Sequence, residues 1–522
     1  MDKRDRLDNK LYDLGQKVDN LQQLNYQSVE FAALQPIIAE LELDFNHLSE
    51  QLVNSDDKIV FDYTKANYMD VLIEIAHRHG NEVRFSSPYS QYTSGDDFLY
   101  DYELKRLNLY REALALYKSN HESKISETWI RQVQVNLSNL YRDTGRIVEA
   151  LDALESSKDV FGMARINYAV NLYRISFCTT EKGAQKGLLL EALKYYETII
   201  KQYPERKEFD SIPEDIFQSL YLGRETLSNI LKSEYKDIPV MCDPPIDLDP
   251  ELGIEFSEYK QWCRSKRLIL SIQNLYQSAS LCDDIHLPNM GIGYFSHDHS
   301  LSYYSWFNTL KQEYNQARYF LYLTQTEQNN YDIHESQENV LLVNTLDYPA
   351  IGYRTELLKC ALRTAYGVLD KIGLLCNAFC GKSMPTHKIG FTNWFTGIEN
   401  EIRINDNFTA LYWVAKDLSR SGSFKTFRLL RNVIEHRYLR IIDNTSISLE
   451  DELSVEDKME YIVSYSDLQK QTYEILKLIR ALLFYVVFAF HKCYLETMEM
   501  CERENKVFIP LAIDYYDDEW KN

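Results

Sequence analysis

The stretch NLSNLYRDTGRIVEALDAL, residues 136–154, indicates how this chain folds. Its apolar residues recur at three- and four-residue spacing on both sides of Gly145, which predicts two short helices joined by a tight turn. The same spacing extends over almost all of the 522 residues, and only 18 glycines and 12 prolines interrupt it. No series of alternating apolar and polar residues predicts a sheet. The sequence therefore predicts an all-α fold.

This hairpin resembles a tetratricopeptide (TPR) repeat, because its small and aromatic residues stand at the TPR spacing. These residues are Asn136, Leu137 and Tyr141 before the turn, and Ala150, Leu151 and Leu154 after it. A second, looser hairpin runs from NYAVNLYRI through an insertion, EKGAQKG, to EALKYYETIIKQYPE, where Ala192, Tyr196 and Pro204 fit the pattern. Two repeats are fewer than a stable array usually needs, so degenerate hairpins are expected to complete a TPR-like domain over residues 51–236.

The remaining chain is expected to divide around this domain. Residues 1–50 predict a helical segment that docks through one apolar stripe rather than a coiled coil. Residues 237–258 hold four of the twelve prolines and predict a linker. Residues 259–506 predict a second helical domain, followed by a tail at 507–522. The stripe of the first segment consists of Leu7, Leu11, Leu14, Val18 and Leu21.

Composition narrows the functional classes. A formal net charge of −21 argues against a surface that wraps nucleic acid nonspecifically, so any such contact must be local. The start of the chain is polar, which does not fit an export signal. The longest apolar run, Ala481–Phe490, is too short to span a bilayer and predicts a buried core helix. The nine cysteines contain no CxxC pair, as expected for a reduced, cytoplasmic protein.

The stretch KTFRLLRNVIEHRYLRI, residues 425–441, is a basic segment in this acidic chain. The spacing of its apolar residues predicts one helix that buries an apolar stripe and points its basic side chains away from that stripe. Asn432 and His436 share one face, and Arg431 lies about 140° around the helix from His436. The predicted stripe is Phe427, Leu430, Val433, Ile434 and Ile441.

Arg431 and His436 are the chemically most suggestive pair in this segment. A guanidinium binds phosphate oxygens with two parallel hydrogen bonds and keeps its charge, and an imidazole transfers protons near neutral pH. Together they suit cleavage of RNA by its own 2′-hydroxyl, with a 2′,3′-cyclic phosphate and a 5′-hydroxyl as products. This chemistry requires no cofactor and no metal.

The string from Arg431 to His436 resembles the R-x4-6-H motif of HEPN domains, including a polar residue directly after the arginine. The segment YRTELLKCALRTAYGVLDKIGLLCNAF resembles the long first helix of that fold. The span from about Tyr259 to Glu496 is similar to a bacterial family that joins TPR-like repeats to a HEPN domain; the similar pieces are YKQWCRSKRLIL, LKQEYNQARYFLY and AYGVLDKIG. This resemblance implies a four-helix bundle, a homodimer that brings two motifs together, and ribonuclease action in antiviral defence or as a toxin.

Other residues are candidates for supporting roles. Asn432 is placed in the catalytic group, to position the phosphate or steady the histidine. Asp370 is a candidate to orient Arg431 across the bundle, and Glu435 to pair with an arginine. A cation stripe, namely Lys425, Arg428, Arg437 and Arg440, is a candidate RNA-binding surface.

Several alternatives stay open at this point. Arg431 and Glu435 fit a simple ion pair on an exposed helix face. The whole protein fits a non-catalytic interaction protein, in which the repeats bind a partner and the bundle dimerises. Tyr438 fits a target for modification by a partner enzyme. His297 and His299 have a spacing found in metal sites, but no further ligands lie nearby. The end of CNAFCGKS, residues 376–383, imitates a phosphate-binding loop but follows a helix rather than a strand.

Overall fold

Helices dominate the computed structural model of this protein, and the predicted all-α class is confirmed. The chain forms two compact units. The N-terminal unit comprises Met1–Asn171 and Lys194–Arg224, and the C-terminal unit comprises Leu172–Leu193 and Glu225–Asn522. The structure describes residues 3–27, 29–79, 95–179, 181–210, 212–240, 257–277, 280–289, 300–326, 335–344, 349–382, 384–398, 408–419, 422–442 and 459–506.

The N-terminal unit begins with α1 (Lys3–Tyr26), α2 (Phe31–Ser49), α3 (Ser55–His79) and α4 (Gly95–Ser119). The apolar stripe of α1, from Leu7 to Leu21, lies in one core with α2 and α3, as expected for a docked helix. On the solvent side, Lys17 Nζ lies 2.6 Å from Glu40 and 2.7 Å from Asp44 of α2. The first segment of the chain is thus packed onto its neighbours through its own apolar face.

The hairpin at residues 136–154 is formed by α5 (Glu127–Asp143) and α6 (Ile147–Leu154). Gly145 adopts φ 74°, a left-handed conformation that glycine tolerates best, and it makes the predicted turn. The Ser138 hydroxyl donates to the Ala150 carbonyl at 3.0 Å, because both small residues let the helices approach closely. The helical hairpin expected here is therefore present.

The second hairpin differs from its prediction. It consists of α7 (Gly162–Ser176) and α8 (Lys182–Asp210), and α9 (Glu214–Glu234) follows. The expected insertion EKGAQKG is instead the start of α8, and α8 continues through Pro204 to Asp210. Gly187 has a packing role, because a Cβ at this position would collide with the Tyr276 hydroxyl. Gly187, in the expected insertion, therefore reflects close contact with another part of the C-terminal unit.

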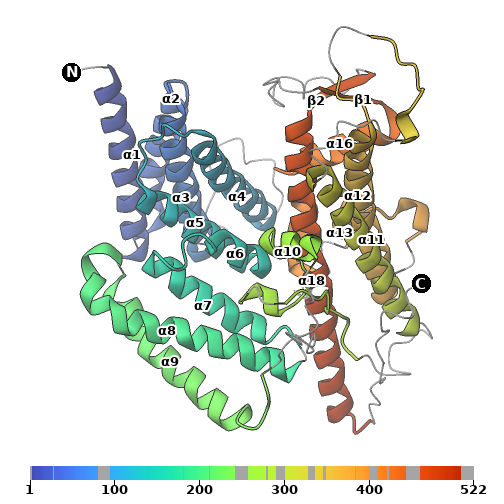
Figure 1. The fold of residues 1–522 in the computed structure, drawn as a ribbon. Coiled ribbons are helices and arrows are strands. Elements are labelled where there is room, and N and C mark those ends of the chain that lie inside the picture. Colours follow the sequence, from blue (N-terminus) through green and yellow to red (C-terminus); the bar gives the residue numbers. More distant parts are fainter. Residues whose placement is uncertain are drawn as a thin grey trace. The chain divides into compact units, whose positions relative to one another are not determined.

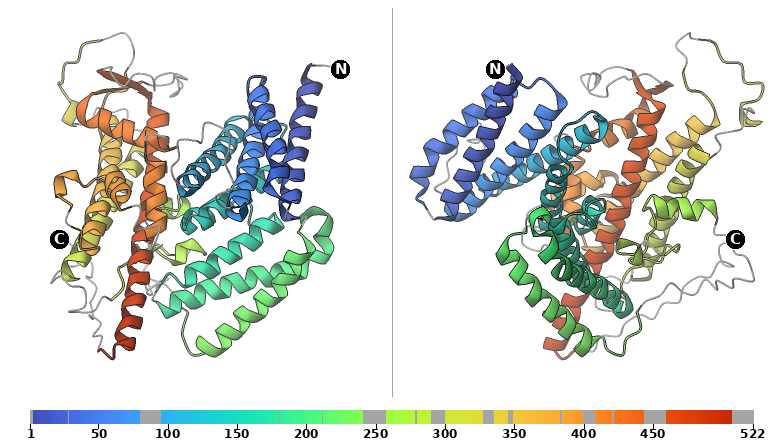
Figure 2. Two further views of the ribbon diagram at one scale, coloured as in Figure 1. Left: turned by 180° about the vertical axis from the view of Figure 1, so that it is seen from behind. Right: turned by 60° about the vertical axis from the view of Figure 1, so that its left-hand side comes forward.

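Three long helices build the C-terminal unit: α11 (Ser300–Thr326), α12 (Tyr353–Phe379) and α18 (Tyr465–Arg503). Figure 2 shows α18 running the length of this unit. Ala481–Phe490 is buried throughout, which confirms the predicted core helix. Phe490 stacks on Phe379 at 3.7 Å between ring centroids, and Tyr303 of α11 meets both rings edge-on. These contacts join all three helices in one apolar core.

Shorter elements surround the bundle. They are α10 (Glu258–Ser265), η3 (Gln273–Leu275), η4 (Glu335–Gln337), η5 (Thr386–Lys388), α13 (Phe391–Gly397), α15 (Thr409–Asp417) and α16 (Lys425–His436). Within the described residues, no helix combines the length and apolar character that crossing a membrane requires.

A buried ion pair ties the segment after α10 to α11. Arg318 is 1% exposed, and its Nη1 and Nη2 donate to the two carboxylate oxygens of Asp283 at 2.9 and 2.7 Å. The same guanidinium donates to the Leu268 carbonyl at 2.7 Å and to the Tyr259 hydroxyl at 3.0 Å. The similar pieces YKQWCRSKRLIL and LKQEYNQARYFLY thus meet around one arginine.

The prediction of a single helix over residues 425–441 is wrong. The helix ends at His436, and Tyr438–Ile442 is a strand, β1, that pairs in parallel with β2 (Glu460–Ser464). Figure 1 shows the two strands side by side next to α16. Aromatic and β-branched residues in YLRII favour a strand once a partner is available. Consequently Ile441 is buried by the strand pair, and Ile434 stays only half-buried.

Candidate active site

The candidate site lies at the carboxyl end of α16. Phe427, Leu430 and Val433 recur at three-residue spacing and are buried, which fixes the rotation of the helix. The helix ends because Arg437 is extended, with φ −139° and ψ 179°, and its N–H donates to the Val433 carbonyl at 2.8 Å. This rotation leaves Arg431 and Asn432 half-buried and His436 exposed.

Arg431 contacts α12 as well as its own helix. Its Nη2 lies 3.7 Å from Asp370 Oδ2, and its Nη1 donates to Asn432 Oδ1 at 3.2 Å. The guanidinium also lies over the Tyr366 ring, 5.6 Å from its centroid. The Arg431 side chain is still 36% exposed, so a ligand oxygen can reach it from solvent.

Asp370 is itself anchored. Its Oδ1 accepts a hydrogen bond from the Phe391 N–H at 3.2 Å, at the first residue of α13. Burial, with a smaller contribution from Asp370, raises the pKa of Tyr366 to about 12, while Arg431 acts in the opposite direction. Tyr366 is therefore a neutral phenol at physiological pH.

Glu435 has an arginine partner, but not the one expected on its own helix. Its Oε1 lies 2.9 Å from Nε of Arg363 on α12, and Arg363 Nη2 donates to the Ile434 carbonyl at 3.4 Å. The contacts of Arg431 are with Asp370, Asn432 and Tyr366 instead. The simple Arg431–Glu435 pair is thus not what the structure contains.

The candidate RNA-binding cations are divided between two elements, because the predicted helix stops early. Lys425 and Arg428 lie on α16, exposed and half-buried respectively. Arg437 is exposed at the helix end, and Arg440 on β1 lies 3.4 Å from Glu460 on β2. The cations therefore do not form one continuous helix face.

Sequence reasoning missed Tyr366 and Arg363, although a signal for them exists. Both lie on α12 at i−4 and i−7 from Asp370, so all three share one helix face. Once Asp370 is assigned to face Arg431, this spacing places the other two beside α16 as well.

Two weaker candidate sites were the His297–His299 pair and the segment CNAFCGKS. His297 and His299 lie outside the described residues. In CNAFCGKS, Gly381 has φ 63° directly after α12, which is typical of a residue that ends a helix, and Ser383 is outside the described residues. Over the described ranges, no three His, Cys, Asp or Glu side chains are grouped so that they could hold a metal ion.

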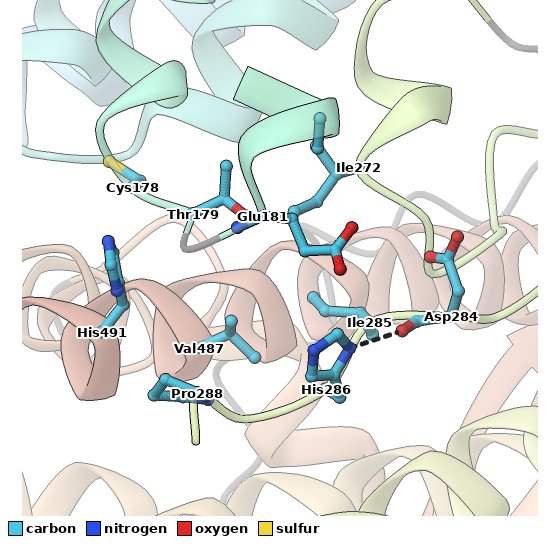
Figure 3. Close-up of a pocket in the computed structure, with 11 residues that line it drawn as sticks. Cys178, Thr179, Glu181, Ile272, Asp284, Ile285, His286, Pro288, Val487 and His491 are labelled. Carbon is cyan, nitrogen blue, oxygen red and sulfur yellow. Dashed lines mark hydrogen bonds between the residues drawn. The ribbon is translucent and has the colours of Figure 1, made fainter. Parts of the chain in front are cut away.

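A pocket elsewhere in the C-terminal unit does not contain any of these candidate residues. It lies between the segment that joins α7 to α8, residues 284–288 and α18 (Figure 3). His286 Nδ1 is 3.1 Å from the Asp284 carbonyl oxygen, and His491 projects into the pocket from α18. Burial, assisted by Lys182, lowers the pKa of His491 to about 4, so this histidine is neutral at pH 7.

The Arg431 and His436 arrangement is chemically suited to a phosphodiester. It offers a guanidinium for the phosphate oxygens and an imidazole for proton transfer, both open to solvent. Residues 295–492 match the family model of LA2681-like HEPN domains, so the C-terminal unit contains a HEPN domain. No curated protein and no solved structure matches the chain.

Proposed function

We propose that the HEPN domain of residues 295–492 is an endoribonuclease in which Arg431 and His436 are the catalytic residues. The observation that supports this most strongly is the accessibility of the pair. Phe427, Leu430 and Val433 of the same helix are buried, whereas the Arg431 side chain is 36% exposed and His436 is exposed. This access is what a phosphodiester requires in order to reach both groups.

In the proposed reaction, His436 accepts the proton of the ribose 2′-hydroxyl. The 2′-oxygen attacks the adjacent phosphorus, the new P–O2′ bond forms, and the P–O5′ bond breaks. The products are a 2′,3′-cyclic phosphate and a 5′-hydroxyl. Arg431 stabilises the additional negative charge on the phosphate oxygens during this step.

The departing 5′-oxygen must receive a proton, and we place one imidazole of each chain, that of His436, at this site among the described residues. Tyr366 is a poor donor, because its pKa of about 12 is far from the working pH. A homodimer that places two copies of α16 together would supply a second His436 as the acid. We therefore include a HEPN-mediated dimer in the proposal.

Asp370 and Asn432 have positioning roles in this proposal. Asp370 lies on the α12 side of the guanidinium and Asn432 accepts from its Nη1, so the two restrict where Arg431 points. Glu435 is assigned to a surface ion pair with Arg363 of α12, outside the chemistry. Lys425, Arg428, Arg437 and Arg440 are assigned to the RNA backbone on either side of the cleaved linkage.

The helical hairpins of the N-terminal unit are proposed to bind a protein that controls the nuclease. Stacked hairpins such as α5 and α6 offer an extended surface for a polypeptide, and the proposed chemistry lies in a different unit. Such a controlled ribonuclease fits an antiviral defence system or a toxin.

The test compares purified wild type with Arg431→Ala and His436→Ala on RNA, and also compares growth of cells that express each protein. The matched controls are Arg503→Ala and His121→Ala, since both residues are exposed, Arg503 ends α18 and His121 belongs to the N-terminal unit. We expect cleavage and growth arrest with wild type and both controls, and a loss of about 100-fold or more with the site variants. If purified wild type leaves RNA intact and the site variants equal it in cells, the protein is instead a non-catalytic interaction protein; if wild type and the site variants cleave RNA equally, Arg431 and His436 are not the catalytic residues.

A further inference from the structure

The outward face of the strand pair lies directly after the candidate catalytic helix. Parallel pairing sets Tyr438 beside Glu460 and Leu439 beside Tyr461. Because side chains alternate along a strand, Tyr438 and Arg440 share one face, and Leu439 and Ile441 share the other. Tyr461 and Ile441 are buried, so the face that carries Tyr438 is the one turned to solvent.

Tyr438 offers an open aromatic ring on a fixed backbone. Its side chain is 70% exposed, although its N–H is bound to the Met459 carbonyl at 3.0 Å. The ring is therefore accessible to a ligand, while the strand pairing fixes the backbone that carries it.

The ring is also close to His436. One extended residue, Arg437, separates the two, so their Cα atoms are about 7 Å apart. Glu435, His436, Arg437 and Tyr438 form a continuous exposed run. A single nucleotide bound with its phosphate at His436 can thus bring its base to Tyr438.

We propose that Tyr438 is a stacking platform for the unpaired base next to the cleaved phosphate, which makes single-stranded RNA the substrate. This inference rests on the proposed ribonuclease function and specifies its substrate. A base can lie on an aromatic ring only when it is not stacked in a duplex.

The charge of the protein supports the same choice. Binding to a duplex depends mainly on many phosphate contacts, and a chain of net charge −21 repels a polyanion except where cations are gathered locally. Stacking supplies affinity without further positive charge, and every base has a flat face, so the platform is tolerant of sequence.

The experiment measures binding of a 2′-O-methyl oligonucleotide, which cannot be cleaved by its own 2′-oxygen, as a single strand and as a duplex. Tyr438→Ala should weaken binding of the single strand roughly 5- to 150-fold, the range for loss of one aromatic–base stack. Tyr438→Phe keeps the ring and should bind like wild type. Tyr12→Ala is the matched control, because Tyr12 is 68% exposed and lies in the N-terminal unit.

The inference is overturned if Tyr438→Ala binds the single strand as wild type does, or if wild type prefers the duplex. Because the oligonucleotide is never cut, either result leaves the cleavage assays with Arg431→Ala and His436→Ala unaffected. Conversely, failure of those cleavage assays would refute the proposed function whatever the binding result.

Discussion

Replacing Asp283 with asparagine is expected to destabilise the C-terminal unit severely. Asp283 is 8% exposed and faces Arg318, which is 1% exposed. The asparagine oxygen can still accept from the Leu270 N–H, which now binds Asp283 Oδ1 at 2.8 Å. Its amide nitrogen, however, would face the Arg318 guanidinium, so a donor would meet a donor inside the core.

The expected cost follows from the charge left behind. Removing one member of a buried ion pair usually costs about 3–5 kcal/mol, since the other charge stays desolvated. For a large domain this lowers the melting temperature by roughly 6 °C or more. Lys260→Met is the matched control. Lys260 Nζ lies 3.5 Å from the same carboxylate but is 37% exposed, so its loss should cost less than about 1 kcal/mol.

The assay is urea and thermal unfolding, followed by circular dichroism at pH 7 and pH 5. Burial by itself would raise the pKa of Asp283, but Arg318 and its hydrogen bonds lower it to about 2. The stabilisation is therefore complete above pH 3.8, the ordinary value, and is lost only as the pH falls towards 2. The deficit of Asp283→Asn should be equal at both pH values. A deficit below 1 kcal/mol would refute the view that this ion pair holds the segment to α11.

Further predictions concern the site and the pocket. Asp370→Asn keeps the oxygen that accepts from the Phe391 N–H but removes a negative charge 3.7 Å from Arg431. Since both side chains are over one-third exposed, kcat/KM for RNA cleavage should fall only about 2- to 5-fold. A 100-fold loss would instead make Asp370 a proton-transfer group. Glu435→Ala breaks a half-exposed ion pair and should change the unfolding free energy by less than about 1 kcal/mol; a larger loss would contradict this surface assignment. His491 binds a proton less readily when folded, so stability should fall by up to about 3 kcal/mol between pH 6.5 and pH 4, and His491→Phe should abolish this slope in urea titrations. An unchanged slope would mean that other groups cause it.

The periodic spacing of apolar residues was sufficient to predict most of the helices from the sequence. Ala481–Phe490 and residues 136–154 contain their own apolar spacing, and both fold as that spacing predicts. The end of α16 was not predictable in this way. Ile434 and Ile441 are seven residues apart, which fits two turns of helix, while β1 depends on pairing with Glu460–Ser464 much later in the chain.

Single residues whose role depends on a partner far away in the sequence were likewise not predictable. Gly187 looks like a loop residue in the sequence, and the reason for it, Tyr276, is distant along the chain. Asp370 was identified because a carboxylate in an apolar region invites a partner, and it does lie beside Arg431. Tyr366 is marked in the sequence only by its i−4 spacing from Asp370, because tyrosine is frequent in this chain and suits ordinary packing.

The most direct test of the proposed chemistry is the dependence of cleavage on one 2′-hydroxyl. An RNA that wild type cuts at a mapped linkage is synthesised again with 2′-deoxyribose on the 5′ side of that linkage only. We expect that cutting there stops, and that the unmodified RNA yields a 2′,3′-cyclic phosphate and a 5′-hydroxyl. Cutting of the modified linkage, or products with a 5′-phosphate, would contradict it.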